Sequence, residues 1–147
     1  MELIRGYTPT MESPAIRYAA TDDGASLAYW TRGAGPDLLY VNIPLWSHAE
    51  LVCGLEPLHR FLEGIGRGRR LIYFDPRGFG LSSGEPQGSF RDWEPDISAV
   101  LAAAGAGCVS LVSAEYASKP ALIYAARHPS QVNGMVLWSG TAEAPLE

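Results

Sequence analysis

The stretch LVSAEYASKPALIYAARH, residues 111–128, joins an apolar run to an amphipathic segment through a short polar turn. Residues 108–112 form a short apolar run bounded by glycine, which is typical of a buried strand. Residues 120–128 follow and are expected as a helix. The stretch therefore predicts a strand, a tight turn and a helix in direct succession.

Glu115 is placed at the tip of this turn by its small neighbours. A strained strand-to-helix turn that presents one side chain at its tip needs small residues two positions before and two positions after that side chain. Ser113 and Ala117 meet this requirement. The sequence therefore predicts an exposed carboxylate at a position where many enzymes carry a nucleophile.

Strand-like and helix-like segments alternate along the rest of the chain. A hairpin is expected over residues 16–32, around the turn signal Asp23-Gly24. The remaining elements are expected as strands at 38–43, 71–74 and 134–138 and helices at 48–62 and 95–104. This order predicts an α/β fold with a mostly parallel sheet of about six strands, helices on both faces and an N-terminal antiparallel hairpin. Residues 15–147 are expected to form this core and residues 1–14 an N-terminal extension.

Composition and charge narrow the class of partner. The 147 residues carry a net charge of −5 without a long run of lysine and arginine, which argues against nucleic acid and anionic membranes as partners. A small neutral or cationic molecule fits better. No segment has the layout of a signal peptide or membrane span, so the cytoplasm is the expected location. The two cysteines and three histidines lack metal-ligand spacing, and neither a metal nor a cofactor is expected.

Loops at the carboxyl ends of the strands are expected to carry any chemistry, because ligands of open α/β sheets bind there. The loop of residues 75–90 contains Gly78 and Gly80, which partly match a dinucleotide-binding turn. Ser83 stands where the third glycine would be needed, and Pro86 follows it. A nucleotide site is therefore only weakly indicated.

The segments YFDPRGFGLSS (73–83) and LVSAEYASKPALIYAARHPSQVNGMVLWSG (111–140) resemble the α/β-hydrolase family. That family carries D-x-R-G-x-G-x-S after its fourth strand and G-x-S-x-G after its fifth. The resemblance covers Ile16 to Gly140 and looks closest to hydrolase-like domains fused to bacterial adenylate cyclases and to some regulators. It implies that Asp75 and Arg77 brace the loops around the site.

The second family motif is altered in this chain. Glu115 replaces the nucleophilic serine, and Ser113 and Ala117 replace the two glycines. Family members that attack with a carboxylate, the epoxide hydrolases and haloalkane dehalogenases, use aspartate, which is one methylene shorter than glutamate. Ser113 and Ser118 are weaker candidates, because one ends the strand and the other lies in the first helical turn.

The stretch NIPLWSHAE (42–50) occupies the place of the family's oxyanion loop. Pro44 stands where the family has glycine, and the amides of Leu45 and Tyr116 are the expected donors. With Glu115 ionised, these amides are expected to hold its carboxylate. The aromatic residues Trp46 and Tyr116 either wall a pocket or pack in the core or a lid.

The resemblance places the catalytic acid and histidine after later strands than the sixth, where this chain ends. His48, His59 and His128 match no family position. Two hypotheses follow: a catalytically degenerate module that binds a small molecule or another chain, or a hydrolase of an ester, epoxide or halide that uses Glu115 with a base and lid supplied by other sequence or a second subunit. The open edge at residues 134–138 predicts a homodimer or another covering chain.

Overall fold

A six-stranded sheet forms the centre of the computed structural model, which describes residues 14–140. The strands lie in the order β1-β2-β4-β3-β5-β6 across the sheet. Their bounds are β1 (Arg17–Ala20), β2 (Ser26–Arg32), β3 (Asp37–Val41), β4 (Arg70–Phe74), β5 (Val109–Ala114) and β6 (Val132–Trp138). The expected fold class is confirmed, and the extension expected over residues 1–14 lies almost entirely outside the described residues.

The first two strands form the predicted hairpin. β1 pairs antiparallel with β2, and β2 pairs antiparallel with β4. The connecting turn depends on Gly24, whose φ of 88° lies in the left-handed region that favours glycine. The remaining neighbours β4, β3, β5 and β6 are parallel, so the carboxyl ends of β3, β4 and β5 meet at one edge of the sheet.

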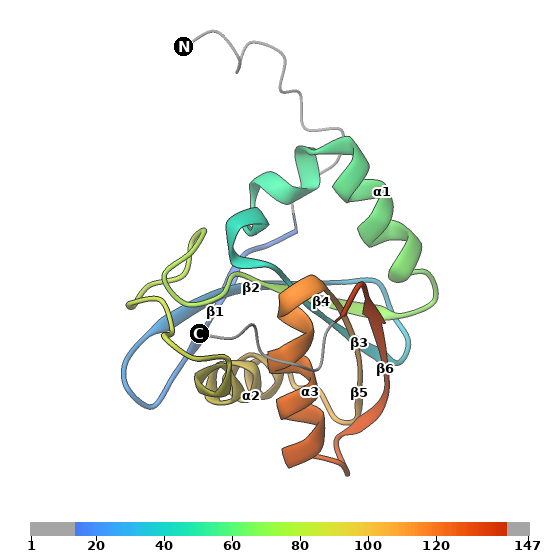
Figure 1. The fold of residues 1–147 in the computed structure, drawn as a ribbon. Helices are drawn as coiled ribbons and strands as arrows, with labels where there is room; N and C mark the ends of the chain where they lie inside the picture. Colours follow the sequence, from blue (N-terminus) through green and yellow to red (C-terminus); the bar gives the residue numbers. More distant parts are fainter. Residues whose placement is uncertain (1–13, 141–147) are drawn as a thin grey trace, which may run out of the picture.

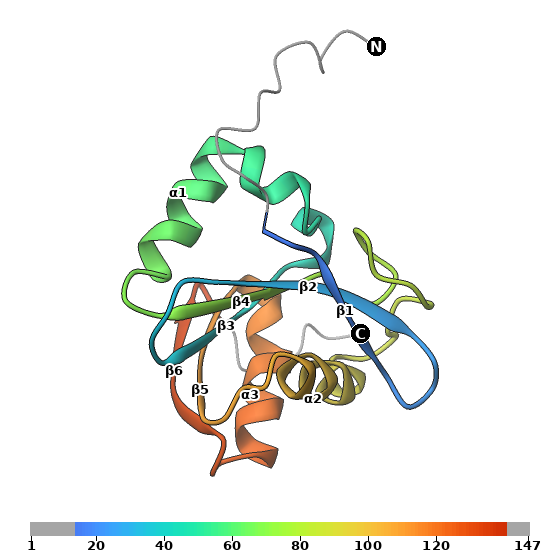
Figure 2. The same cartoon turned by 180° about the vertical axis from the view of Figure 1, so that it is seen from behind.

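The α-helices of residues 14–140 cover the two faces of the sheet, as Figures 1 and 2 show from opposite sides. Helix α1 (Glu56–Ile65) lies on one face, and helices α2 (Trp93–Ala103) and α3 (Ser118–Arg127) lie on the other. Alternating strand residues supply both cores. Leu39 and Leu111 pack toward α2 and α3, whereas Leu38 and Tyr73 pack toward α1.

The helix predicted over residues 48–62 is wrong in its extent. The structure has a 3₁₀ helix at Leu51–Gly54, followed by α1 from Glu56 to Ile65. Pro57 explains the interruption, because a proline has no backbone N–H to bond to the preceding turn and is accommodated only where a helix begins. The proline therefore starts a new helix instead of continuing the first.

Strand β6 is the edge strand beside β5, and its outer residues are poorly covered. Val136 is 61% exposed and Trp138 is 64% exposed.

Within residues 14–140, no helix is long and apolar enough to cross a membrane.

Candidate functional site

Glu115 lies at the turn between β5 and α3, at the carboxyl edge of the sheet. Its φ of 50° is in the left-handed region, which is strained for a residue other than glycine. The following residues form a 3₁₀ helix, Glu115–Ala117, that leads directly into α3. Ser113 and Ala117 are both fully buried, so the turn closes tightly around them while the Glu115 side chain is exposed.

The expected contact between the Glu115 carboxylate and the amides of Leu45 and Tyr116 is not formed. Among residues 14–140, no hydrogen bond reaches this carboxylate. The loop at Pro44–Trp46 instead folds into its own 3₁₀ turn, in which the Trp46 amide donates to the Ile43 carbonyl at 3.0 Å. This turn leaves Leu45 79% and Trp46 70% exposed, so neither side chain closes a pocket.

The charge of Glu115 affects the pKa of two tyrosines, Tyr40 and Tyr116. Burial raises the pKa of the Tyr40 phenol, and the Glu115 carboxylate raises it further. The pKa of Tyr116 is raised by the same two causes in the same order. Tyr40 extends from β3 and is 6% exposed, and the Tyr116 ring lies 6.3 Å from the Phe90 ring. The exposed carboxylate therefore has phenol groups near it that remain protonated at neutral pH.

Asp75 joins the loops that follow β3 and β4. Its side chain is fully buried, and Oδ2 accepts hydrogen bonds from the amides of Ala49 and Leu81, both at 2.9 Å. Oδ1 is buried without a hydrogen-bond partner in the described part of the chain. Burial raises the pKa of Asp75, while the Leu81 and Ala49 amides and the nearby His48 oppose this change.

Gly80 makes this arrangement possible. A Cβ atom at Gly80 would lie 2.2 Å from Oδ2 of Asp75, and its φ of 55° is left-handed. Only glycine allows the loop backbone to approach the carboxylate this closely. The second glycine of the D-x-R-G-x-G-x-S pattern, Gly80, thus leaves room for the carboxylate of the aspartate, Asp75.

Arg77 joins the same loop to helix α2 and to the β1–β2 turn. Its Nε and Nη2 atoms donate to the two carboxylate oxygens of Asp96, and Nη1 donates to Asp23. Arg77 and Asp96 are both buried. Hydrogen bonds to Asp96 and Asp23 raise the pKa of Arg77, and Arg77 lowers the pKa of Asp23 to about 2.

The chain combines a mixed six-stranded sheet, a left-handed strand-to-helix turn at Glu115 and a loop after β4 that is braced by Asp75. A sequence profile of the α/β hydrolase fold matches residues 47–147, more than half of the chain. The chain belongs to the α/β-hydrolase fold family. No curated protein sequence shows a significant match.

Solved structures of several hydrolases share the fold of this chain. A hydrolase from Pseudomonas aeruginosa PA01 superposes with a TM-score of 0.77 at 24% identity, covering 91% of this chain and 49% of that chain. A carboxylesterase structure from Nitrososphaera gargenis gives a TM-score of 0.71 at 17% identity, covering 88% and 47%. An epoxide hydrolase mutant from Vigna radiata gives 0.65 at 22% identity, covering 86% and 39%. The chain spans about half the length or less of these structures, and the identities establish the fold alone.

In this α/β-hydrolase fold protein, the two serines near Glu115 are buried. Ser113 and Ser118 are both fully buried, and their Oγ atoms are 3.4 Å apart. A Cβ atom at Gly140 would lie 2.7 Å from the Ser118 hydroxyl, so the chain after β6 packs against this serine. Neither hydroxyl is presented to a substrate.

The three histidines of the chain are engaged away from Glu115. Nδ1 of His48 accepts from the Leu51 amide at 3.3 Å. Nε2 of His59 lies 3.2 Å from the Glu63 carboxylate, and Nε2 of His128 lies 2.7 Å from the carboxylate of Glu94. We call the turn at residues 113–117, between β5 and α3, the elbow. None of the histidines forms a hydrogen bond with Glu115 at its tip.

Lys119 is a feature of the elbow that the sequence did not indicate. It is 6% exposed, and its Nζ atom has no hydrogen-bond partner in the described chain. The ammonium group lies 5.2 Å from the centroid of the Phe90 ring, a cation–π contact. A lysine in the first turn of an amphipathic helix ordinarily predicts exposure, so no sequence signal distinguished it. Among residues 14–140, no group of histidine, cysteine and acidic residues is arranged to hold a metal ion.

Proposed function

We propose that this chain is a non-catalytic member of the α/β-hydrolase fold family that binds a small cationic molecule at the elbow. The observation that supports the proposal is the exposed Glu115 carboxylate, which has no ion-pair or hydrogen-bond partner among the described residues. Tyr40 and Tyr116 lie within electrostatic range of it. Carboxylates and aromatic rings together favour ammonium groups through ion pairing and cation–π attraction.

The surroundings of Glu115 argue against serine-type catalysis by this chain. A hydroxyl nucleophile requires an adjacent base to take its proton. Ser113 and Ser118 are buried, and each histidine is engaged with another group. We expect no hydrolysis of short-chain p-nitrophenyl esters above the buffer rate.

A second candidate function is hydrolysis with Glu115 as a covalent nucleophile. The left-handed backbone at Glu115 supports it, because this conformation presents the side chain at the tip of the elbow. The matched structure from Vigna radiata is an epoxide hydrolase mutant, which bears on the substrate class only by analogy. Against this candidate, the extra methylene of glutamate displaces its oxygen by roughly 1 Å, and errors of that size can cost about 10²-fold in rate.

Titration with tetramethylammonium tests the binding proposal. The signals of the Tyr40 and Tyr116 rings, followed by NMR, should shift saturably, and Glu115→Gln should weaken binding by about fivefold. The uncharged tert-butanol should bind more weakly than the cation. An unchanged affinity in Glu115→Gln would contradict the proposal.

Hydrolysis assays separate the two candidates. We expect Glu115→Ser to remain inactive toward p-nitrophenyl acetate, because no histidine is placed to activate the new hydroxyl. Turnover of styrene oxide by the wild type that is lost in Glu115→Gln would favour the nucleophile hypothesis. Ester turnover that is lost in Ser113→Ala would instead show that a buried serine becomes accessible.

A further inference from the structure

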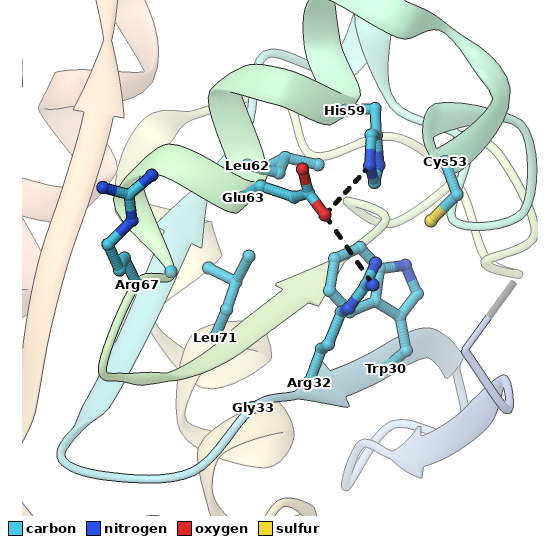
Figure 3. Close-up of a pocket in the computed structure, with 10 residues that line it drawn as sticks. Trp30, Arg32, Gly33, Cys53, His59, Leu62, Glu63, Arg67 and Leu71 are labelled. Atoms are coloured by element: carbon cyan, nitrogen blue, oxygen red, sulfur yellow. Dashed lines mark ion pairs between the residues drawn. The ribbon is translucent and has the colours of Figure 1, made fainter. Parts of the chain in front are cut away.

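Helix α1 covers only part of its face of the sheet. Figure 3 shows Leu62 on the side of α1 that faces Trp30 of β2 and Leu71 of β4, and all three side chains are buried. Phe61 and Ile65 of the same helix line a separate groove of about 560 Å³, whose other walls come from β3, β5 and β6. The sheet is therefore covered over β2 and β4 but open over β5 and β6.

The open part of this face is apolar and accessible. Gly134, Val136 and Trp138 alternate along β6, and all three line the groove. Val136 and Trp138 are largely exposed, and the Trp138 ring lies 6.1 Å from the Phe61 ring. Among the described residues that line the groove, only Arg69 is charged, and its guanidinium donates a hydrogen bond to a serine of β5 at 3.3 Å. A contiguous apolar surface of this kind marks an interaction site.

The edge of β6 lacks the features that keep edge strands from pairing with another chain. β6 has seven residues, VNGMVLW, and none of them is charged or is a proline. The opposite edge strand β1 has four residues and carries Arg17. Short length, charge and proline are the common means by which natural proteins protect such edges. β6 is therefore the edge of the described sheet that is suited to accept a further strand.

The regular part of β6 is centred on Val136. β6 follows β5 residue by residue from Gly134 to Trp138, whereas the register shifts just before, between Val109 and Ser110. Antiparallel pairing of two copies about Val136 would place Gly134 opposite Trp138 of the partner subunit, the smallest residue opposite the largest. A Cβ atom at Gly134 would have nothing within 4 Å, so the space beside it is open to an indole ring.

We propose that β6 pairs antiparallel with β6 of a second copy of this chain, about a two-fold axis at Val136. The pairing continues the sheet from one protomer into the other and joins the two grooves on the same face. The partner's Trp138 covers Gly134, and Val136 packs against its own counterpart. Apolar burial, cross-strand side-chain contacts and new backbone hydrogen bonds stabilise the pair. Arg69 precedes β4, so the two copies hold their arginines at opposite ends of the joined grooves.

Cysteine cross-linking tests the register. In a Cys108→Ser background, which removes the exposed native thiol, Val136→Cys should form a covalent dimer on mild oxidation. Directly opposite residues of an antiparallel pair lie close enough for a disulfide. Gly134→Cys is the matched control, because it lies on the same strand and face but would be roughly 14 Å from its counterpart. Circular dichroism verifies that both variants fold. A covalent dimer from Val136→Cys alone supports the proposal, whereas equal yields from the two variants, or none from either, would overturn it.

Hydrogen exchange of the wild type provides a test without any variant. Successive amides of a strand point to opposite sides, so every second amide of β6 points away from β5. At high micromolar concentration these amides should exchange at least about tenfold more slowly than in an unpaired strand. The outward amides of β1, the opposite edge strand, are the control and should stay unprotected. Unprotected outward amides in β6 would refute pairing with a second copy.

Discussion

Arg77 and Asp96 form a two-pronged ion pair inside the protein, joining the loop after β4 to helix α2. The Nε–Oδ2 distance is 3.1 Å, and Nη2 donates to Oδ1 of the same carboxylate. Both side chains are buried, and Arg77 makes its third contact with the exposed carboxylate of Asp23. Arg77 therefore joins three segments that are distant in sequence: the β1–β2 turn, the loop after β4 and helix α2.

Removal of the Arg77 charge should destabilise the fold strongly. Arg77→Gln leaves Asp96 buried without its counter-ion, which costs about 3–5 kcal/mol in the free energy of unfolding. Asp23→Asn is the matched control, because it removes the exposed partner of the same guanidinium and should cost far less stability than Arg77→Gln. Urea denaturation measures both values. Equal losses in the two variants would contradict the assigned role of burial.

Relief of the left-handed conformation at Glu115 should stabilise the protein. Glu115→Gly should raise the free energy of unfolding by about 0.5–1 kcal/mol, because glycine adopts a positive φ without steric cost. Glu115→Gln retains the strain and should leave the stability almost unchanged. The two variants are compared by thermal and chemical denaturation, and a loss of stability in the glycine variant would show that the turn is not strained.

Removal of the Glu115 charge should make two tyrosines more acidic. A neighbouring carboxylate disfavours the phenolate, so Glu115→Gln should lower the pKa of Tyr40 and Tyr116. Both pKa values should stay above the ordinary tyrosine value, because burial is the larger cause of the increase. Tyrosinate absorbance, followed through a reversible alkaline titration, measures the change. An identical titration in the variant would place the carboxylate beyond electrostatic range.

Glu94 should contribute stability only when it is ionised. Hydrogen bonds from His128 and then Arg127 lower the pKa of this carboxyl below its unfolded value. Its contribution is therefore present above the unfolded pKa and is lost as the pH falls through the lower folded pKa. Glu94→Gln should cost about 0.5–1 kcal/mol at neutral pH and little in strong acid. A cost that does not depend on pH would indicate lost packing instead of lost charge.

The exposed edge strand β6 leads us to expect a homodimer. Its backbone is paired only on the β5 side within the described sheet, and Val136 and Trp138 are largely exposed. Light scattering after size exclusion should give twice the monomer mass, and Val136→Lys should shift the mass toward the monomer. Tyr18→Lys is the control, because Tyr18 is a 55% exposed residue on the opposite edge strand β1. A wild type that remains monomeric at high concentration would contradict this expectation.

The alternation of strands and helices could be predicted from local sequence patterns, because each element buries one face with its own periodicity. Gly24 marked a turn, and Pro95 marked the first turn of a helix, for reasons contained in their own covalent structure. The small residues around Glu115 likewise indicated a sharp turn. The extent of α1 was mispredicted, because the break at Pro57 had been masked by continuous helical spacing on both sides.

Only the tertiary structure decided which distant groups meet. The pairing of Arg77 with Asp96, the approach of Gly80 to Asp75 and the proximity of Tyr40 to Glu115 depend on strand order and loop path, which local patterns do not encode. Local patterns likewise did not indicate the 3₁₀ turn at Pro44–Trp46. The sequence by itself determined the kinds of elements and the residue at the elbow. The packing of those elements determined the chemical surroundings of Glu115, because side-chain burial and charge interactions arise only when the sheet and helices are assembled.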